Sequence, residues 1–273
     1  DARLTKNVGE QSTVGGIVTR GNPSGTGDNA VYGLDATHRA SVFSDGRDLI
    51  TSGFFLQADS EGVSGDQSAF GFDVSAPGDL VAWRAGALEI QDDFEAALGF
   101  VPRPGIRRYS GSIDYQPRPA LSGVRQLEFG LGTQVFTDTS GELETWTTEF
   151  QPFGVFLESG DALVLEIEHT HDELTAPFEI QEGIFIPIGE YDFTGAQLSV
   201  ETAEKRDLSG GIGLSAGDFY DRERTGFFAS LKWQPGPLFN GQCVYDRNDV
   251  SLEGGDFETQ LAQLRANFSF TPE

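Results

Sequence analysis

Two histidines separated by one residue, His169 and His171, form the strongest metal-ligand pattern in the sequence. Residues i and i+2 of an extended chain point to the same face, so both imidazoles could hold one transition-metal ion. They also continue the alternation of Leu163, Leu165 and Ile167, which places them on an apolar face at the start of a loop. We therefore expect polar surface residues here and no bound metal.

Carboxylates form two further candidate patterns. Glu166 and Glu168 share a strand face, and a glycosidase needs two carboxyl groups at a defined separation. Such pairs also arise by composition in a chain with 43 acidic and 18 basic residues, so we expect no catalysis. Calcium is the one cofactor that loop acids could bind, through Asp92, Asp93, Glu95, Asp218, Asp221 and Glu223. Their loops lack the regular acid spacing and central glycine of a calcium loop, which favours solvated loops.

The sequence gives little support for an enzyme that uses a nucleophilic side chain or a nucleotide cofactor. No serine nucleophile with a nearby histidine can be assembled, and Gly210–Gly213 lacks the strand-turn-helix context of a dinucleotide site. The single cysteine, Cys243, shares parity with Phe239 and Tyr245 and reads as a small apolar residue. The sequence thus favours a protein that is not an enzyme.

Charge and cysteine content exclude several classes. A net charge of -25 excludes nucleic acid as a natural partner, because a phosphate backbone requires basic residues. One cysteine excludes an internal disulfide framework. No apolar run reaches the roughly 18 residues of a membrane-spanning helix. A transmembrane barrel stays open, since its strands alternate lipid-facing and lumen-facing residues.

Apolar and polar residues alternate along the chain, and helical periodicity is absent. Residues 49–60 place Ile50, Phe54 and Leu56 on an apolar parity, and residues 68–76 do the same with Phe70 and Phe72. The strands we predict are 3–8, 11–20, 29–40, 48–59, 67–77, 80–91, 107–117, 123–137, 144–157, 162–172, 192–204, 209–219, 224–235, 238–248 and 258–270. Most are long enough for a tilted strand to cross a bilayer.

The predicted connections alternate between short and long. The long, acidic ones are 21–29, 59–67, 92–106, 137–144, 172–191, 218–224 and 248–256. Short turns on one side and longer loops on the other are typical of an outer-membrane barrel, with the turns in the periplasm. A soluble sandwich has no reason to sort its loops in this way.

Polar residues on the second parity should line a lumen: Arg108, Glu128, Glu149, Glu166, Glu168, Glu201, Lys232 and Arg265. A dry core could not hold so many charges without a large desolvation cost. The competing interpretation is a soluble β-sandwich or solenoid with the apolar parity inside. It would bury Phe54, Phe72, Phe129 and Leu131 in a dry interior.

The loop 172–191 is apolar as well as acidic. Its large apolar residues are Phe178, Ile180, Ile184, Phe185, Ile186 and Ile188. A purely solvated loop would not carry so many. We expect this segment to extend the wall as a hairpin, to fold inward as a plug, or to dock a partner chain.

Several segments resemble one family: Val8–Gly15, Arg107–Ser112, Pro177–Ile180, Ile186–Phe193, Gly217–Asp221 and Glu223–Thr225. They are similar to the C-terminal outer-membrane β-barrel region of a bacterial family of unknown function, whose longer members carry an N-terminal xylanase-type carbohydrate-binding module. The resemblance implies a barrel in the outer membrane and no catalytic mechanism. No segment here resembles the module, so sugar binding is assigned to no residue.

The sequence predicts an all-β protein, an antiparallel transmembrane β-barrel of about 14–16 strands in the bacterial outer membrane. Residues 1–273 form a single domain, and an odd strand count predicts that it is the C-terminal part of a longer protein. The predicted function is a pore, transport or scaffold component whose partners are outer-membrane lipid, lipopolysaccharide and other envelope proteins. Two alternatives stay open: a barrel enzyme or glycan-binding protein acting on surface polysaccharide, and a soluble acidic β-sandwich from a high-salt organism.

Overall fold

The structure is a computed structural model that describes residues 1–23, 25, 27–44 and 46–270. Ser24, Thr26 and Asp45, which fall within predicted connections, and Thr271–Glu273 lie outside the described residues. The described residues form strands, turns and loops and contain no helix, which confirms the all-β prediction. Accordingly, no described helix has the length and apolar character needed to cross a membrane.

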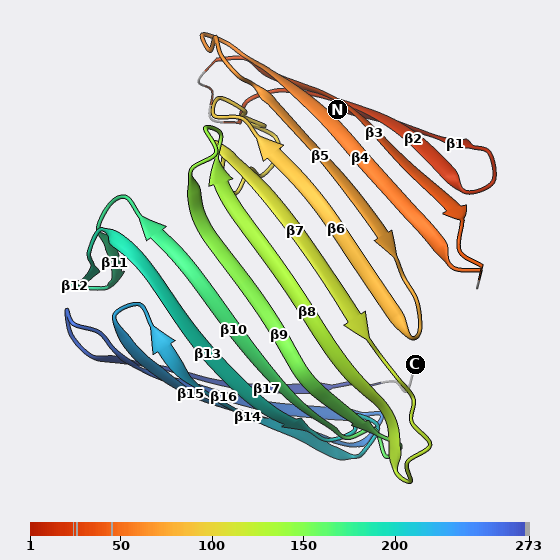
Figure 1. The fold of residues 1–273 in the computed structure, drawn as a ribbon, viewed down its shortest axis with the longest axis vertical. Coiled ribbons are helices and arrows are strands. Elements are labelled where there is room, and N and C mark those ends of the chain that lie inside the picture. The colour runs from red at the N-terminus through yellow and green to blue at the C-terminus, as the bar shows by residue number, and fades with distance from the viewer. Residues whose placement is uncertain (24, 26, 45, 271–273) are drawn as a thin grey trace. The chain divides into compact units, whose positions relative to one another are not determined.

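Long strands account for most of the described chain (Figure 1). Their bounds are β1 Ala2–Val8, β2 Ser12–Arg20, β3 Asn29–Ser41, β4 Asp48–Ser60, β5 Ser68–Ala76, β6 Val81–Ile90, β7 Ile106–Tyr115, β8 Val124–Asp138, β9 Leu143–Leu157, β10 Ala162–Leu174, β11 Phe178–Gln181, β12 Ile184–Ile186, β13 Gly189–Glu201, β14 Leu208–Phe219, β15 Arg222–Gly236, β16 Phe239–Ser251 and β17 Phe257–Phe268. These bounds agree with the predicted strands to within a few residues.

The described long strands form one antiparallel sheet of 15 strands in chain order, β1 to β10 followed by β13 to β17. β11 and β12 pair only with each other, as a separate hairpin between β10 and β13. Two predictions about the connections are wrong. The segment 137–144 was expected to be a long loop, but β8 ends at Asp138 and β9 begins at Leu143, which leaves four residues between them. The segment 218–224 was expected to be a long loop, but β14 and β15 pair as far as Phe219 and Arg222, which leaves a two-residue turn.

The chain divides into two compact units. The N-terminal unit contains Asp1–Ile113 and Gly132–Trp146, and the C-terminal unit contains Asp114–Leu131 and Thr147–Glu273. We describe each by itself. Within each, strand ends joined by long connections such as 91–105 or 175–188 are called the long-loop ends, and the opposite ends are called the short-turn ends.

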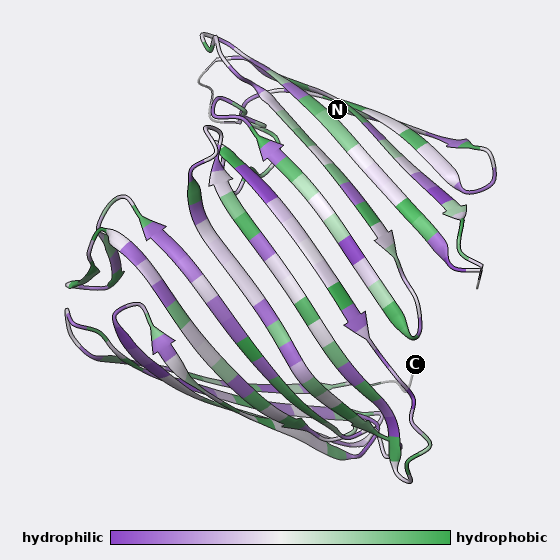
Figure 2. Cartoon of the chain, in the orientation of Figure 1, coloured by the Kyte–Doolittle hydropathy of each residue, from purple (hydrophilic) through white to green (hydrophobic). Residues whose placement is uncertain are grey.

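Strand register separates the C-terminal unit into two chemically different faces. One row of paired residues is wholly apolar, running Leu163, Val200, Ile212, Ala229, Tyr245 and Ala262 from β10 to β17. A row on the opposite face contains only polar residues and glycine: Glu166, Gln197, Ser215, Gly226, Asn248 and Thr259. We call these the apolar face and the polar face, and Figure 2 shows the alternation along the strands that produces them.

The N-terminal unit has the same two faces, with one departure from the prediction. Phe55 stacks on Phe70 at 6.5 Å, on the apolar face. Phe54 instead pairs with Asp35 and Gly71, on the polar face. The expectation that Ile50, Phe54, Leu56 and Ala58 belong to the apolar parity was therefore wrong. β4 thus carries a large apolar residue on each parity, Phe54 on the polar face and Phe55 on the apolar face.

Glycines let neighbouring side chains lie flat on the polar face. A Cβ atom at Gly71 would lie 2.7 Å from Cε1 of Phe54, and one at Gly15 would lie 2.6 Å from Oδ2 of Asp35. Each of these side chains leans across the adjacent strand into the space that the glycine leaves. In the C-terminal unit, the paired Gly195 and Gly217 allow the backbones of β13 and β14 to approach closely.

We expect Gly217→Ala to lower the free energy of unfolding by about 1–3 kcal/mol, because the added methyl group would overlap the Cα of Gly195 and the carbonyl oxygen of Thr194. Gly195→Ala is the matched control, since nothing lies within 4 Å of a Cβ there. Urea unfolding of the purified protein, followed by tryptophan fluorescence, measures both. Equal losses in the two variants would contradict this account.

Candidate functional site

The polar face holds the residues that were predicted to line a lumen. Register places Glu166, Glu168, Glu201, Lys232 and Arg265 on it directly. Glu149 lies on the parity opposite to the exposed Trp146 and Phe150. Arg108 has the parity of Ser110, whose Oγ would lie 3.3 Å from a Cβ at Gly86 on the polar face. Glu128 has the parity of Gly130, where a Cβ would lie 3.5 Å from the Cβ of Gln151, and Gln151 has the parity of Glu149. All the predicted lumen residues therefore share the polar face within their own units.

In the N-terminal unit, the loop 91–105 folds over the long-loop end of the polar face. Phe94 is 5% exposed and packs in a buried cluster with Val31, Ala58, Ala69, Ile90 and Ile106. Val31 has the parity of Asp35 on β3, and Ala69 has the parity of Asp73 on β5, so both pairs Val31–Ala58 and Ala69–Ile90 lie on the polar face. This loop therefore supplies a small local core on a face that is otherwise polar.

Asn29 ties this loop to the strands. Its side-chain nitrogen donates to Oγ of Ser60 at 2.9 Å and to the carbonyl oxygen of Glu95 at 3.1 Å, and its oxygen accepts from the backbone N–H of Ala97 at 3.1 Å. The sequence analysis missed Asn29. A signal existed, because an asparagine at the start of an apolar strand must satisfy its amide when it is buried.

In the C-terminal unit, the β11–β12 hairpin folds over the polar face in the same way. Ile186 is 1% exposed and packs against Val250 and Leu252, while Ile180 and Ile184 contact the same cluster. Register places Val250 on the polar face, opposite Arg224. The hairpin therefore packs on the polar face, and the three outcomes considered for this segment (a wall extension, a plug or a docking site) stay predictions. Phe178, Phe185 and Ile188 stay exposed.

An aromatic cluster of Tyr191, Phe193, Phe219 and Tyr220 lies beneath the hairpin. Tyr220 has a positive φ of 51°, which is uncommon for a bulky residue and indicates a position held by its surroundings. Its hydroxyl donates to Oδ2 of Asp172 at 3.0 Å. Burial, followed by the charge and the hydrogen bond of Asp172, raises the pKa of Tyr220 to about 12.

The candidate metal ligands make protein contacts instead. His171 Nδ1 lies 3.0 Å from Oδ1 of Asp192, and His169 Nδ1 lies 3.0 Å from Oγ1 of Thr194, both at the long-loop end of the apolar face. Among the loop acids, Asp92 accepts from Thr139 and Asp221 accepts from the backbone N–H of Glu253. No group of three His, Cys, Asp or Glu residues that could hold a metal ion gathers in the described chain.

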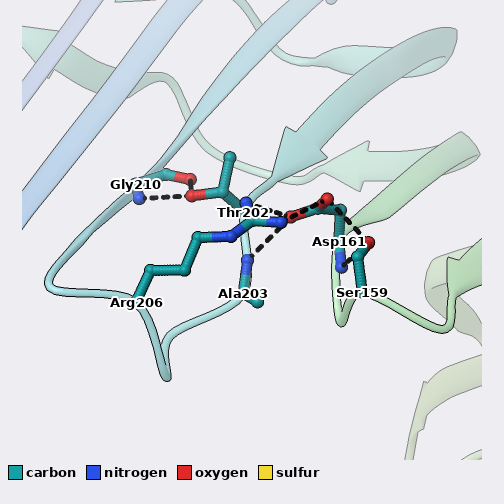
Figure 3. Close-up of polar contacts among 6 residues, drawn as sticks. All are labelled: Ser159, Asp161, Thr202, Ala203, Arg206 and Gly210. Atoms are coloured by element: carbon teal, nitrogen blue, oxygen red, sulfur yellow. Dashed lines mark hydrogen bonds and ion pairs between the residues drawn. The ribbon is translucent and has the colours of Figure 1, made fainter.

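An ion pair between Asp161 and Arg206 links two connections at the short-turn end of the C-terminal unit (Figure 3). Asp161, between β9 and β10, accepts from Nη1 and Nη2 of Arg206 at 2.6 and 2.8 Å. It also accepts from Ser159 at 2.7 Å and from the backbone N–H of Ala203 at 2.9 Å. These hydrogen bonds, first from Arg206 and then from Ser159, hold the pKa of the Asp161 carboxyl well below its usual range.

This lowered pKa predicts a pH dependence of stability. A depressed carboxyl pKa stabilises the fold above the unfolded value of about 4, and the stabilisation is lost as the pH falls towards the folded value. Arg206→Gln removes the main cause, so the difference in urea midpoint between wild type and variant should be larger at pH 7 than at pH 2. A difference that does not change with pH would contradict the assignment to Asp161.

Aromatic residues flank the apolar face. Tyr32, Tyr109 and Trp146 are each the fourth residue of a strand that begins at its long-loop end. Trp83, Tyr115 and Trp233 lie near short-turn ends, where Trp233 pairs with Leu208 at the start of β14. Between these positions the face carries aliphatic residues together with phenylalanines such as Phe55, Phe70 and Phe72. Tyr245 departs from this pattern, because it lies in the middle of β16.

Comparison of the chain with protein-family models, with curated proteins and with solved structures gives no match. The family resemblance described above therefore stays a prediction.

Proposed function

We propose that this protein is an outer-membrane β-barrel whose apolar face contacts lipid and whose polar face lines an aqueous lumen, acting as a pore with a loop-narrowed mouth. The observation that carries the proposal is the exposed apolar face. Large side chains on it, including Leu198, Ile212, Leu214, Leu231 and Leu264, are between 42% and 82% exposed. A soluble protein rarely leaves so large a contiguous apolar surface in water.

The exposure of large apolar side chains within each unit supports the same proposal. Phe54, Phe72, Phe129 and Leu131, which a soluble sandwich would bury, are between 36% and 54% exposed. Such a sheet lacks the dry core that would stabilise it in water, and a bilayer supplies the missing apolar surroundings.

The height of the apolar face also suits a membrane. On β14 the apolar parity runs from Leu208 to Ala216, about 27 Å along a strand that rises about 3.4 Å per residue. At a strand tilt of about 40°, this corresponds to about 20 Å along the membrane normal, close to the band of an outer-membrane barrel. The next pair towards the long-loop end, Asp218 and Glu223, is charged.

The native cysteine tests the orientation of the faces. Cys243 is exposed and lies on the apolar face, paired with Leu231 and Leu264. In liposomes it should resist a membrane-impermeant maleimide and react with a lipid-soluble one. The matched control is Gln242→Cys in a Cys243→Ser background, because Gln242 lies on the polar face beside Lys232 and Arg265. The introduced thiol should react with the impermeant reagent. Equal reaction at both positions would refute the membrane assignment.

A variant that lacks the β11–β12 hairpin tests whether this segment narrows the pore. Deleting 179–187 and joining the ends with two glycines removes Ile184 and Ile186 from their contacts with Val250 and Leu252. We expect insertion to persist, judged by protection of Cys243, and the unit conductance in planar bilayers to rise. Replacing the short turn 77–80 with glycines should leave conductance unchanged. An unchanged conductance in the deletion variant, or loss of the folded protein, would argue against a hairpin that narrows a pore.

A further inference from the structure

A groove of about 520 Å³ lies on the apolar face of β1 to β4, wholly within the N-terminal unit. Its floor is Gly16, which pairs with Leu4 on one side and Leu34 on the other. Val18, Tyr32 and Phe55 complete the walls. Because Gly16 lacks a side chain between two leucines, the surface is hollow there. The volume is in the range of small-molecule sites in proteins, about 300–1,000 Å³.

The chemistry of the lining calls for an apolar occupant. Gln57 is a polar side chain at the groove, and its amide is already used. It donates to the carbonyl oxygens of Ala58 and Gln67 and accepts from Oγ of Ser68. A polar ligand would therefore lose its hydrogen bonds to water without replacement. A hydrocarbon chain has no such cost.

A cation lies next to the groove on the side of the long-loop end. Arg20 shares the apolar face with Val18 and is two residues further along β2, a distance of about 7 Å. It pairs with Asp28 at 2.9 Å, and both side chains are largely exposed. An exposed pair of this kind is weak and exchangeable. The guanidinium can therefore bind a phosphate, which it recognises in a bidentate manner.

From this juxtaposition we propose that the groove over Gly16 holds an acyl chain of a phosphate-bearing membrane lipid, with Arg20 binding its head group. The inference rests on the proposed function, since it needs the apolar face to contact lipid. The inference adds a specific lipid-binding site on the apolar face of β1 to β4. The adjoining polar atoms, the phenol of Tyr32 and the guanidinium of Arg20, both lie towards the long-loop end, so the chain should enter with its head group at that end.

The test measures lipid retained by the full chain in native mass spectrometry, with dimyristoyl-phosphatidylglycerol as the probe. Gly16→Leu should fill the groove without strain, because a Cβ there would have only ordinary contacts, 3.6 Å from Gly33 O and 3.7 Å from Leu34 Cδ2. We expect retention to fall about tenfold, the loss of roughly two buried methylenes. Gly111→Leu is the matched control, since Gly111 is on the same face outside the groove and a Cβ there would have one ordinary contact, 3.9 Å from the carbonyl oxygen of Arg84.

The head-group half of the proposal is tested with Arg20→Gln. This variant should lose retention of phosphatidylglycerol and keep that of dimyristoylglycerol, which lacks the phosphate. Equal retention in wild type, Gly16→Leu and Gly111→Leu would overturn the groove, and equal loss of both lipids in Arg20→Gln would overturn the phosphate contact. Protection of Cys243 in liposomes is measured on every variant. If that protection is absent in the wild type, the proposed function itself fails, whereas intact protection with unchanged retention removes only the lipid site.

Discussion

The register of the antiparallel ladder is the constraint on which the rest of the structure depends. Because side chains alternate with a period of two, a slip of one residue in any pair would exchange the faces of every later strand. The register from β10 to β17 keeps Leu163 in one row with Ala262, and Glu166 in one row with Thr259. That continuity produces an exposed apolar face and a charged opposite face on a sheet only one layer thick.

A single layer must be stabilised without a central core, and the chain does this locally. Each unit has one small buried cluster at its long-loop end, centred on Phe94 in one and on Ile186 in the other. In both cases a connection folds onto the polar face and covers the ends of the strands. At the short-turn end of the C-terminal unit, the ion pair between Asp161 and Arg206 holds neighbouring connections together. The long middle sections of the strands keep their ladder hydrogen bonds and make few other buried contacts.

Glycine distribution links this architecture to the proposed function. On the polar face, glycines receive leaning side chains such as Phe54 or allow close strand approach, as at Gly217. On the apolar face, Gly16 instead leaves a hollow that no protein side chain fills. Glycine thus allows close packing on the polar face and forms the floor of the proposed binding groove on the apolar face. Which role a glycine takes depends on the size of the side chains paired beside it.

The sequence by itself determined the strands, their approximate bounds and the face of each predicted lumen residue, because period-two patterning is a local property of the chain. It failed for β4, where Phe54 and Phe55 are apolar on both parities and alternation carries no information. It also did not identify the role of Asn29 or the packing of the β11–β12 hairpin on the polar face. Only the tertiary structure decided these, because they depend on contacts between residues far apart in the chain. Local pattern cannot encode which distant strand a loop will cover.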